Sequence, residues 1–177
     1  GSHWAGVAMY LNTLSADPNI KKTTAALVNQ YDTLLKRNLK IYKGGYIWNS
    51  TYDDIRGTFA ESTNANIIQD VSHGNHVVSY IIAAYQFGNN NWTLDDIKKL
   101  ATTLKELIYD REKNTFKDNV DGTTDSSVSG TGIYIADGWI KLAEYDKDVK
   151  KIFKQFESSP SLKRFNQELQ FKANLNN

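Results

Sequence analysis

Hydrophobic side chains recur every three or four residues along most of the chain, the spacing that predicts amphipathic helices. The pattern is clearest between Asp17 and about Tyr42. Its apolar positions are Ile20, Leu27, Val28, Tyr31, Leu34, Leu35 and Leu39. Between Gly74 and Phe87 apolar residues occupy almost every side of the expected helix, which predicts that it is buried. Further helices are expected at 4–15, 93–109, 131–145, 147–157 and 161–173, with Thr93 as an N-cap.

Two long stretches without helical spacing separate these helices. Residues 43–72 and 111–130 are rich in Asn, Asp, Gly, Ser and Thr, which favour turns. A short extended piece is expected at 46–48, inside the first stretch. Loops of this length within a compact domain are usually functional, so both stretches are candidate places for binding or catalysis.

The order of elements repeats along the chain: a buried helix opened by Gly, an amphipathic Lys-rich helix, and then a long loop. Residues 4–40, 74–109 and 132–157 each fit this template. The periodicity predicts an all-α fold of antiparallel helical hairpins, arranged as an incomplete (α/α) toroid-like array with two long loops on one rim. Because three hairpins make an arc and not a closed ring, we expect the chain to be a fragment of a larger toroid.

Composition and charge narrow the classes of function. The 177 residues suit one domain, and 21 Lys and Arg against 20 Asp and Glu leave a net charge of +1, without the basic surplus of a nucleic-acid-binding protein. The absence of Cys excludes disulfides, thiol nucleophiles and Cys-based metal sites. The longest apolar stretch, 77–85, is much shorter than the roughly 20 residues of a membrane span. Residues 1–3 have the sequence of an expression-tag remnant, which leaves 4–177 as the domain.

The densest cluster of reactive side chains lies where the first long loop enters the buried helix. His73 and His76 are three residues apart there, and Asn75 stands between them. Amides at a helix N-terminus keep a nearby imidazole neutral, so it can act as a base, and the Asn amide can bind a carboxylate. Helix capping and packing explain the same cluster equally well. Asp70 with the two histidines also offers three metal ligands, although a closed zinc site needs a fourth.

Aromatic and polar side chains alternate in the loop that precedes this cluster. They are Tyr46, Trp48, Asn49, Tyr52, Asp53, Asp54, Arg56 and Glu61. Rings on which sugar faces stack, beside groups that bind hydroxyls, are typical of a carbohydrate groove. In the alternative interpretation, 46–48 pins the loop to the core and Arg56 forms a salt bridge instead of binding a substrate carboxylate. Tyr134 begins a later helix in the place that corresponds to Asn75, either on the same rim or in the core.

An Asn-His pair that starts a buried helix, with Tyr and Arg on loops of the same rim, resembles the toroidal polysaccharide lyases. These include the alginate lyases and the chondroitin-AC-type lyases of (α/α) toroid fold. Where alginate lyases have Asn-Asn-His, this chain has His-Gly-Asn-His at 73–76. The resemblance implies that Asn75 neutralises a uronate carboxylate and that His76 or His73 removes the C5 proton. It further implies that Tyr134, Tyr52 or Tyr46 is the acid. In the same way it implies that Arg56 assists.

The leading hypothesis is therefore a carbohydrate-active enzyme, a lyase that cleaves an acidic, uronate-containing polysaccharide by β-elimination. One alternative is a glycoside hydrolase of α/α architecture, for which Asp53, Asp54, Glu61 and Asp70 supply carboxylates. The other alternative is a non-catalytic helical module that binds a glycan or a protein. The lyase hypothesis calls for no cofactor, and a polysaccharide substrate favours a secreted or periplasmic protein.

Overall fold

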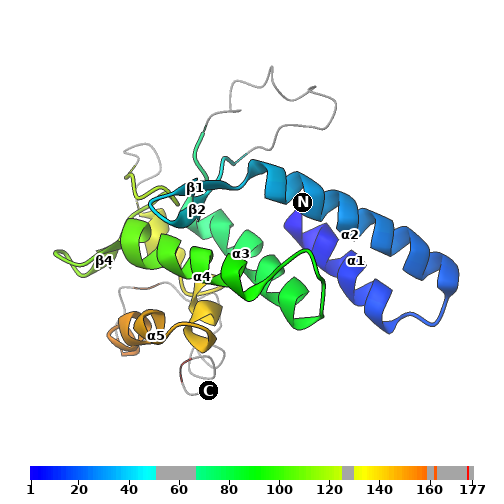
Figure 1. Ribbon diagram of the computed structural model, residues 1–177. Coiled ribbons are helices and arrows are strands. Elements are labelled where there is room, and N and C mark those ends of the chain that lie inside the picture. The colour runs from blue at the N-terminus through cyan, green and yellow to red at the C-terminus, as the bar shows by residue number, and fades with distance from the viewer. Residues whose placement is uncertain (51–66, 125–129, 159–161, 163–174, 176–177) are drawn as a thin grey trace.

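Helices make up most of the structure, and they pack as two hairpins followed by a shorter C-terminal group (Figure 1). The computed structural model describes residues 1–50, 67–124, 130–158, 162 and 175. The α-helices are α1 (Ser2–Leu14), α2 (Pro18–Asn38), α3 (Val71–Gln86), α4 (Leu94–Thr102) and α5 (Lys147–Lys154). The π-helix η1 is Thr103–Ile108, and two 3₁₀-helices are η2 (Thr131–Tyr134) and η3 (Trp139–Glu144). The strands are β1 (Lys40–Tyr42), β2 (Gly45–Ile47), β3 (Tyr109–Asp110) and β4 (Thr115–Phe116).

Polar side chains set the starts of the helices. Asp17 accepts a hydrogen bond from the Asn19 amide at the start of α2, where Pro18 fits the first turn. Thr93 and Asp96 form a capping box at the start of α4, which confirms the predicted N-cap. Asp70 caps α3, so this helix begins at Val71 and not at the predicted Gly74.

A small β-hairpin replaces the end of the second predicted helix. That helix was expected to reach Tyr42, but α2 ends at Asn38 and the next residues form β1, which pairs with β2 in antiparallel register. The connecting residues Lys43 and Gly44 both have positive φ, 48° and 81°, as the two-residue turn between twisted strands requires. The extended piece expected at 46–48 corresponds to β2.

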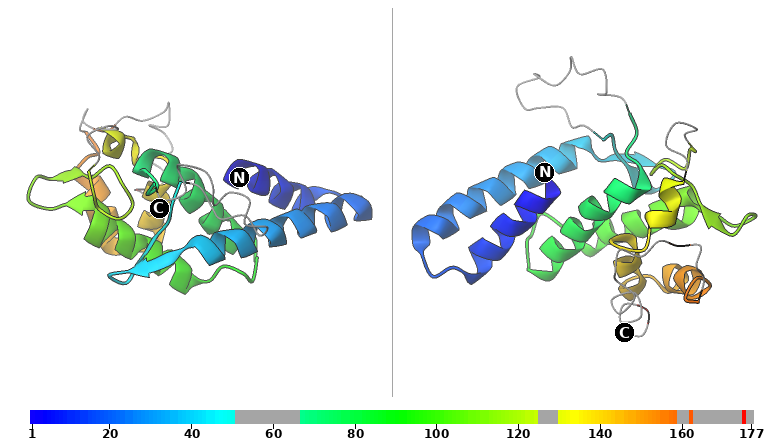
Figure 2. Two further views of the ribbon diagram at one scale, coloured as in Figure 1. Left: turned by 90° about the horizontal axis from the view of Figure 1, so that it is seen from above. Right: turned by 180° about the vertical axis from the view of Figure 1, so that it is seen from behind.

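The centre of the core is α3, which lies between the α1–α2 hairpin and the C-terminal group (Figure 2). Val78, Ile81 and Ala84 of α3 are fully buried, as the almost uniformly apolar sequence of this helix predicts. Near its start, the Trp48 and Trp139 rings stack with centroids 6.0 Å apart. The Trp139 indole N–H donates to the Val71 carbonyl over 3.0 Å and fixes this layer to α3.

The third predicted hairpin is wrong in its first helix. The expected helix at 131–145 is present as the short 3₁₀-helices η2 and η3. Between them, Gly138 approaches α3 so closely that a Cβ there would overlap the Asn75 backbone. A continuous α-helix over 131–145 would not bring the Gly138 backbone this close to Asn75. The helix expected at 161–173 lies almost entirely outside the described residues.

Two features of the array bear on the toroid prediction. The hairpins are antiparallel and adjacent, and α1 packs on α3. Within the described residues they do not close into a ring.

Among those same residues, no helix has both the length and the apolar character needed to cross a membrane.

Candidate functional site

The predicted cluster at the start of α3 lies against η2 and η3, and Asn75 joins the two segments. The Asn75 side chain is 1% exposed. Its amide nitrogen donates to the carbonyls of Ser72 (3.0 Å) and Tyr134 (2.6 Å). Its oxygen accepts from the backbone N–H groups of Gly138 (2.6 Å) and Trp139 (3.2 Å). Backbone groups thus occupy the hydrogen-bonding capacity of Asn75, which favours the packing interpretation over the expected role of neutralising a substrate carboxylate.

The described ends of the two long loops meet at the same place. The Val71 amide at the end of the first loop donates to the Asp118 carbonyl in the second over 2.7 Å. The Asp118 carboxylate, itself buried, accepts from the amides of Gly130 and Gly132 at 3.1 and 3.0 Å. The second loop is thereby closed on itself beside α3. We call the surface formed by 70–76, Tyr134 and Asp137 the α3 rim.

Asp70 orients the first imidazole of the α3 rim. One Asp70 oxygen accepts from the His73 amide (2.9 Å), and the other lies 2.8 Å from His73 Nδ1. Gln69 donates to that second oxygen over 3.0 Å. When Nδ1 carries the proton toward the carboxylate, Nε2 is left as the basic nitrogen. The His73 side chain is 75% exposed, so this nitrogen is open to an incoming molecule.

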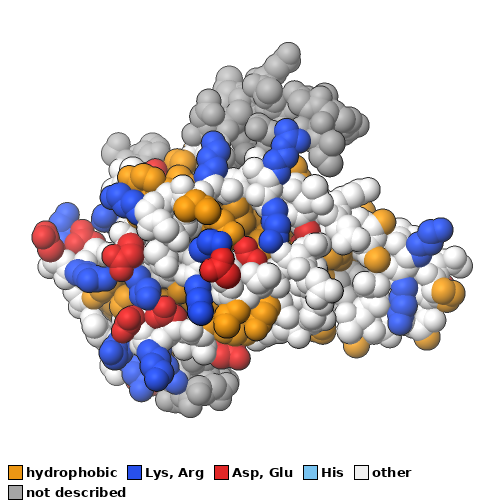
Figure 3. All heavy atoms as spheres, in the orientation of Figure 1, with side chains coloured by type: hydrophobic (Ala, Val, Ile, Leu, Met, Phe, Trp, Pro, Cys, Tyr) orange, Lys and Arg blue, Asp and Glu red, His pale blue; other side chains and the backbone are white. Residues whose placement is uncertain are grey.

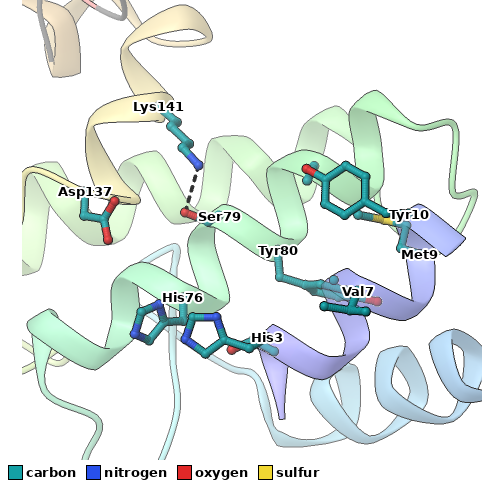
Figure 4. Close-up of a pocket in the computed structure, with 12 residues that line it drawn as sticks. His3, Val7, Met9, Tyr10, His76, Ser79, Tyr80, Asp137 and Lys141 are labelled. Carbon is teal, nitrogen blue, oxygen red and sulfur yellow. Dashed lines mark hydrogen bonds between the residues drawn. The ribbon is translucent and has the colours of Figure 1, made fainter. Parts of the chain in front are cut away.

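His76, one turn further along α3, is half-buried beside Asp137 (Figure 4). Burial lowers the pKa of His76 below its ordinary value, and the neighbouring His3 ring, 4.0 Å away between centroids, lowers it further. Asp137 acts in the opposite direction and His73 in the same direction as His3. The imidazole is therefore mostly neutral near pH 7, the form that accepts a proton.

A pocket of about 380 Å³ opens beside His76, between α1, α3 and η3 (Figure 4). Its polar wall carries His76, Ser79, Asp137 and Lys141, and the Lys141 ammonium donates to the Ser79 hydroxyl over 3.2 Å. The other lining residues are mainly apolar and are Gly6, Val7, Met9, Tyr10, Tyr80 and Ala83, together with Ser2 and His3 at the start of α1. Sequence reasoning missed Asp137 and Lys141. The available signal was two charges four residues apart in an otherwise apolar segment.

Of the aromatic residues predicted to line a sugar-binding groove, the structure describes Tyr46 and Trp48, and both pack in or against the core. Trp48 is 1% exposed, so neither face of its ring is open to a substrate. The Tyr46 hydroxyl donates to Asp96 at the start of α4 over 2.7 Å. Burial, and then this hydrogen bond, raise the pKa of Tyr46, which makes it a poor proton donor. Both rings pin the loop to the core, which was the alternative interpretation.

The remaining predicted residues divide into two groups. Asn49 pairs with Ile68 in an isolated bridge, so it stands at the base of the first loop. Tyr134 is half-buried, and its carbonyl contacts Asn75, which places its backbone on the α3 rim. The others lie outside the described residues and are Tyr52, Asp53, Asp54, Arg56 and Glu61.

The metal interpretation gains no support from the part of the chain that the structure describes. There, no group of three or more His, Cys, Asp or Glu side chains is arranged to hold a metal ion. The Asp70 and His73 side chains share one hydrogen bond with each other, and His76 lies beside His3 and Asp137 instead.

Comparison of the chain with protein-family models, curated proteins and solved structures gives no match in any of the three. The resemblance to toroidal lyases therefore rests only on the few residues named above. A functional assignment depends on the chemistry of the α3 rim.

Proposed function

We propose that the chain is part of a carbohydrate-active enzyme that cleaves an acidic, uronate-containing polysaccharide by β-elimination. The observation that carries the proposal is the pair of imidazoles on successive turns of α3. The His73 ring is hydrogen-bonded to the Asp70 carboxylate. The His76 ring has a lowered pKa and lies beside a pocket that the Lys141 side chain also lines. A neutral base, a fixed cation and room for a sugar are what this reaction needs.

The reaction assigns a task to each group. A base takes the C5 proton, the C5–H electron pair forms the C4=C5 double bond, and the C4–O bond breaks as its oxygen gains a proton. His76 is the proposed base, because its lowered pKa keeps it neutral near pH 7. His73 is the second imidazole, with its ring fixed by Asp70. Tyr134 remains the proposed acid, since its backbone already lies on the α3 rim.

Negative charge develops on the uronate carboxylate as the proton leaves, and a nearby cation stabilises it. Lys141 fits this task better than Asn75, because Lys141 lines the pocket with His76 and its ammonium group donates a hydrogen bond to a neutral hydroxyl, that of Ser79. Arg56 keeps its proposed assisting role, although it lies outside the described residues.

The toroid-like array and an exported location belong to the same proposal. Support for the array comes from the adjacent antiparallel hairpins α1–α2 and α3–α4. Support for export comes only from the substrate class, because acidic polysaccharides are found outside cells or in their envelopes.

The test is an assay of the purified chain on a panel of uronate polymers, such as alginate, polygalacturonate and chondroitin, with a neutral glucan as control. The proposal predicts an unsaturated product with new ultraviolet absorbance from at least one acidic polymer and none from the glucan. New reducing ends without that absorbance would identify a hydrolase. Binding without either product would identify a non-catalytic module.

A further inference from the structure

The outer side of α1 is apolar and uncovered. No Asp, Glu, Lys or Arg occurs in this helix. Its small residues Ala5 and Ala8 are buried, whereas Trp4 and Leu14 are 79% and 77% exposed. Val7 and Leu11, each about half exposed, lie between them. The resulting spacing of three, four and three residues is that of a helix seam that packs against another helix.

The apolar surface continues onto α2. Leu27 is half exposed, and Ile20, seven residues earlier, lies on the same side of the helix and is also exposed. Trp4 and Leu27 together line a hollow of about 310 Å³, whose floor includes Tyr31 and Leu34. We call Trp4, Val7, Leu11, Leu14, Ile20 and Leu27 the α1–α2 apolar face.

The extent of this face is what a protein interface requires. Large apolar side chains each bury on the order of 100–200 Å² when covered, so these six at their observed exposure present on the order of 600 Å². That equals the upper limit of about 600 Å² for the largest patch of a typical monomer. Two such faces together bury about 1,200 Å², the lower limit for a specific complex.

Apolar area and shape favour a copy of the same chain as the partner. In the view of Figure 3, acidic and basic side chains mix over the α4 and α5 half of the molecule, whereas the charged side chains on the α1–α2 half are mainly Lys and Arg. A contact centred on α1 has no charged side chain of its own, so the like charges of α2, such as Lys21 and Lys22 beside Ile20, must lie at its edge. The projecting Trp4 ring stands at the edge of its own apolar hollow, so a two-fold axis places each ring in the hollow of the other copy.

We propose that two copies of this chain associate through the α1–α2 apolar face, with the α1–α2 hairpins packed about a two-fold axis. Its test is separate from that of the catalytic function: of the six residues only Val7 also lines the pocket beside His76, and neither Trp4 nor Leu14, the positions to be changed, does. Because the face only reaches the lower limit of interface size, we expect a weak dimer, with a dissociation constant in the micromolar range of about 1–100 µM.

Sedimentation equilibrium between about 1 µM and 500 µM tests the proposal. The mass should rise from 20.0 kDa toward twice that value as the concentration increases. Leu14→Lys and Trp4→Lys should each raise the dissociation constant at least about tenfold, since each removes one large apolar contact and adds a desolvation cost. Both positions are exposed in the single chain, and circular dichroism checks that each variant stays folded.

Ile41→Lys is the matched control, because Ile41 of β1 is also apolar and 66% exposed but lies outside this face. Its dissociation constant should equal that of the original chain. A monomer at every concentration would overturn the proposal and indicate that another protein segment covers the face. A dimer unchanged by Leu14→Lys and Trp4→Lys, or weakened equally by Ile41→Lys, would also overturn it.

Discussion

The two ends of α3 are each anchored by one buried polar side chain, but the anchors are of opposite kinds. At the N-terminal end, the Asn75 amide donates to two carbonyls and accepts from two backbone N–H groups. Toward the C-terminal end, the Asp32 carboxylate of α2 accepts four hydrogen bonds and is 1% exposed. Its donors are Tyr80, Asn89, Asn91 and Trp92.

The difference shows what each end is built for. Asp32 meets only donors, so an acceptor with two oxygens satisfies them and joins α2 to the α3–α4 turn. Asn75 meets donors and acceptors, so only an amide matches, and it docks the η2–η3 segment that carries Tyr134, Asp137 and Lys141. One anchor holds the scaffold together, and the other assembles the candidate site.

Each anchor can be converted to the opposite kind by Asn75→Asp or Asp32→Asn. We expect the larger loss of stability at Asn75. Asn75→Asp places a charged oxygen against the Ser72 and Tyr134 carbonyls, and we expect a loss of about 3–5 kcal/mol in the free energy of unfolding at pH 7. Protonation lets the new carboxyl donate to one carbonyl, which raises its pKa in the folded state. The loss should therefore shrink as the pH falls, which urea unfolding at pH 7 and pH 4 measures. A loss that does not change with pH would contradict this account of the anchor.

The opposite exchange, Asp32→Asn, should cost about 2–3 kcal/mol, because the new NH₂ group faces donors and leaves part of the Tyr80–Trp92 set unsatisfied. Urea unfolding at pH 7 gives the value. Asp95→Asn in the exposed first turn of α4 is the control and should cost less than about 1 kcal/mol. Equal losses of stability in Asp32→Asn and Asp95→Asn would contradict the role given to Asp32.

Removal of the Tyr80 hydroxyl measures how much one of the four donors to Asp32 contributes to stability. Tyr80→Phe should cost about 1.5–2 kcal/mol, as expected for one hydrogen bond to a carboxylate. Burial, and then Asp32, raise the pKa of Tyr80 well above its ordinary 10.0. Its contribution is thus complete below about pH 10 and is lost as the pH rises beyond that value, because the unfolded phenol ionises first. Unfolding measured from pH 8 to 11 should show a smaller alkaline decline in Tyr80→Phe than in the original chain.

The smallest effect is expected at the α3 rim. Burial lowers the pKa of His76, so the folded state binds this proton less readily than the unfolded state. Its contribution to stability is present above the unfolded pKa of about 6.5 and declines as the pH falls below it. His76→Gln should therefore remove that part of the decline. NMR titration of the two imidazoles gives their pKa values directly, and an unshifted His76 would contradict the assigned environment.

Helical periodicity predicted α1, most of α2, α3 and α4, because burial of one side of each helix fixes the spacing of its apolar residues. The same spacing placed 40–42 in a helix, which was wrong, and 131–145 in one continuous helix, where the chain forms two short 3₁₀-helices instead. In the first case a turn with positive φ at Lys43 and Gly44 favours the hairpin. In the second, the contact between Gly138 and Asn75 interrupts the helix, and this contact joins residues 63 positions apart.

The candidate site was predictable only where its residues adjoin in sequence. His73 and His76 were found because they share one helix start. Lys141 was missed because its place beside Ser79 depends on how η3 docks on α3. The burial of Asn75 and Trp48 could not be predicted for a related reason: a polar amide and an aromatic ring suit a sugar site and a core equally well, and only the packed structure shows which environment they have.

The most direct test of the central claim is the turnover of a uronate polymer by His76→Ala, followed through the absorbance of the unsaturated product. The account predicts a rate about 10²–10⁴ lower than that of the original chain, as for the loss of a general base, with a nearly unchanged melting temperature. His3→Ala, which removes the neighbouring ring, should keep most of the activity. Full activity in a folded His76→Ala protein would contradict the assignment of His76 as the base.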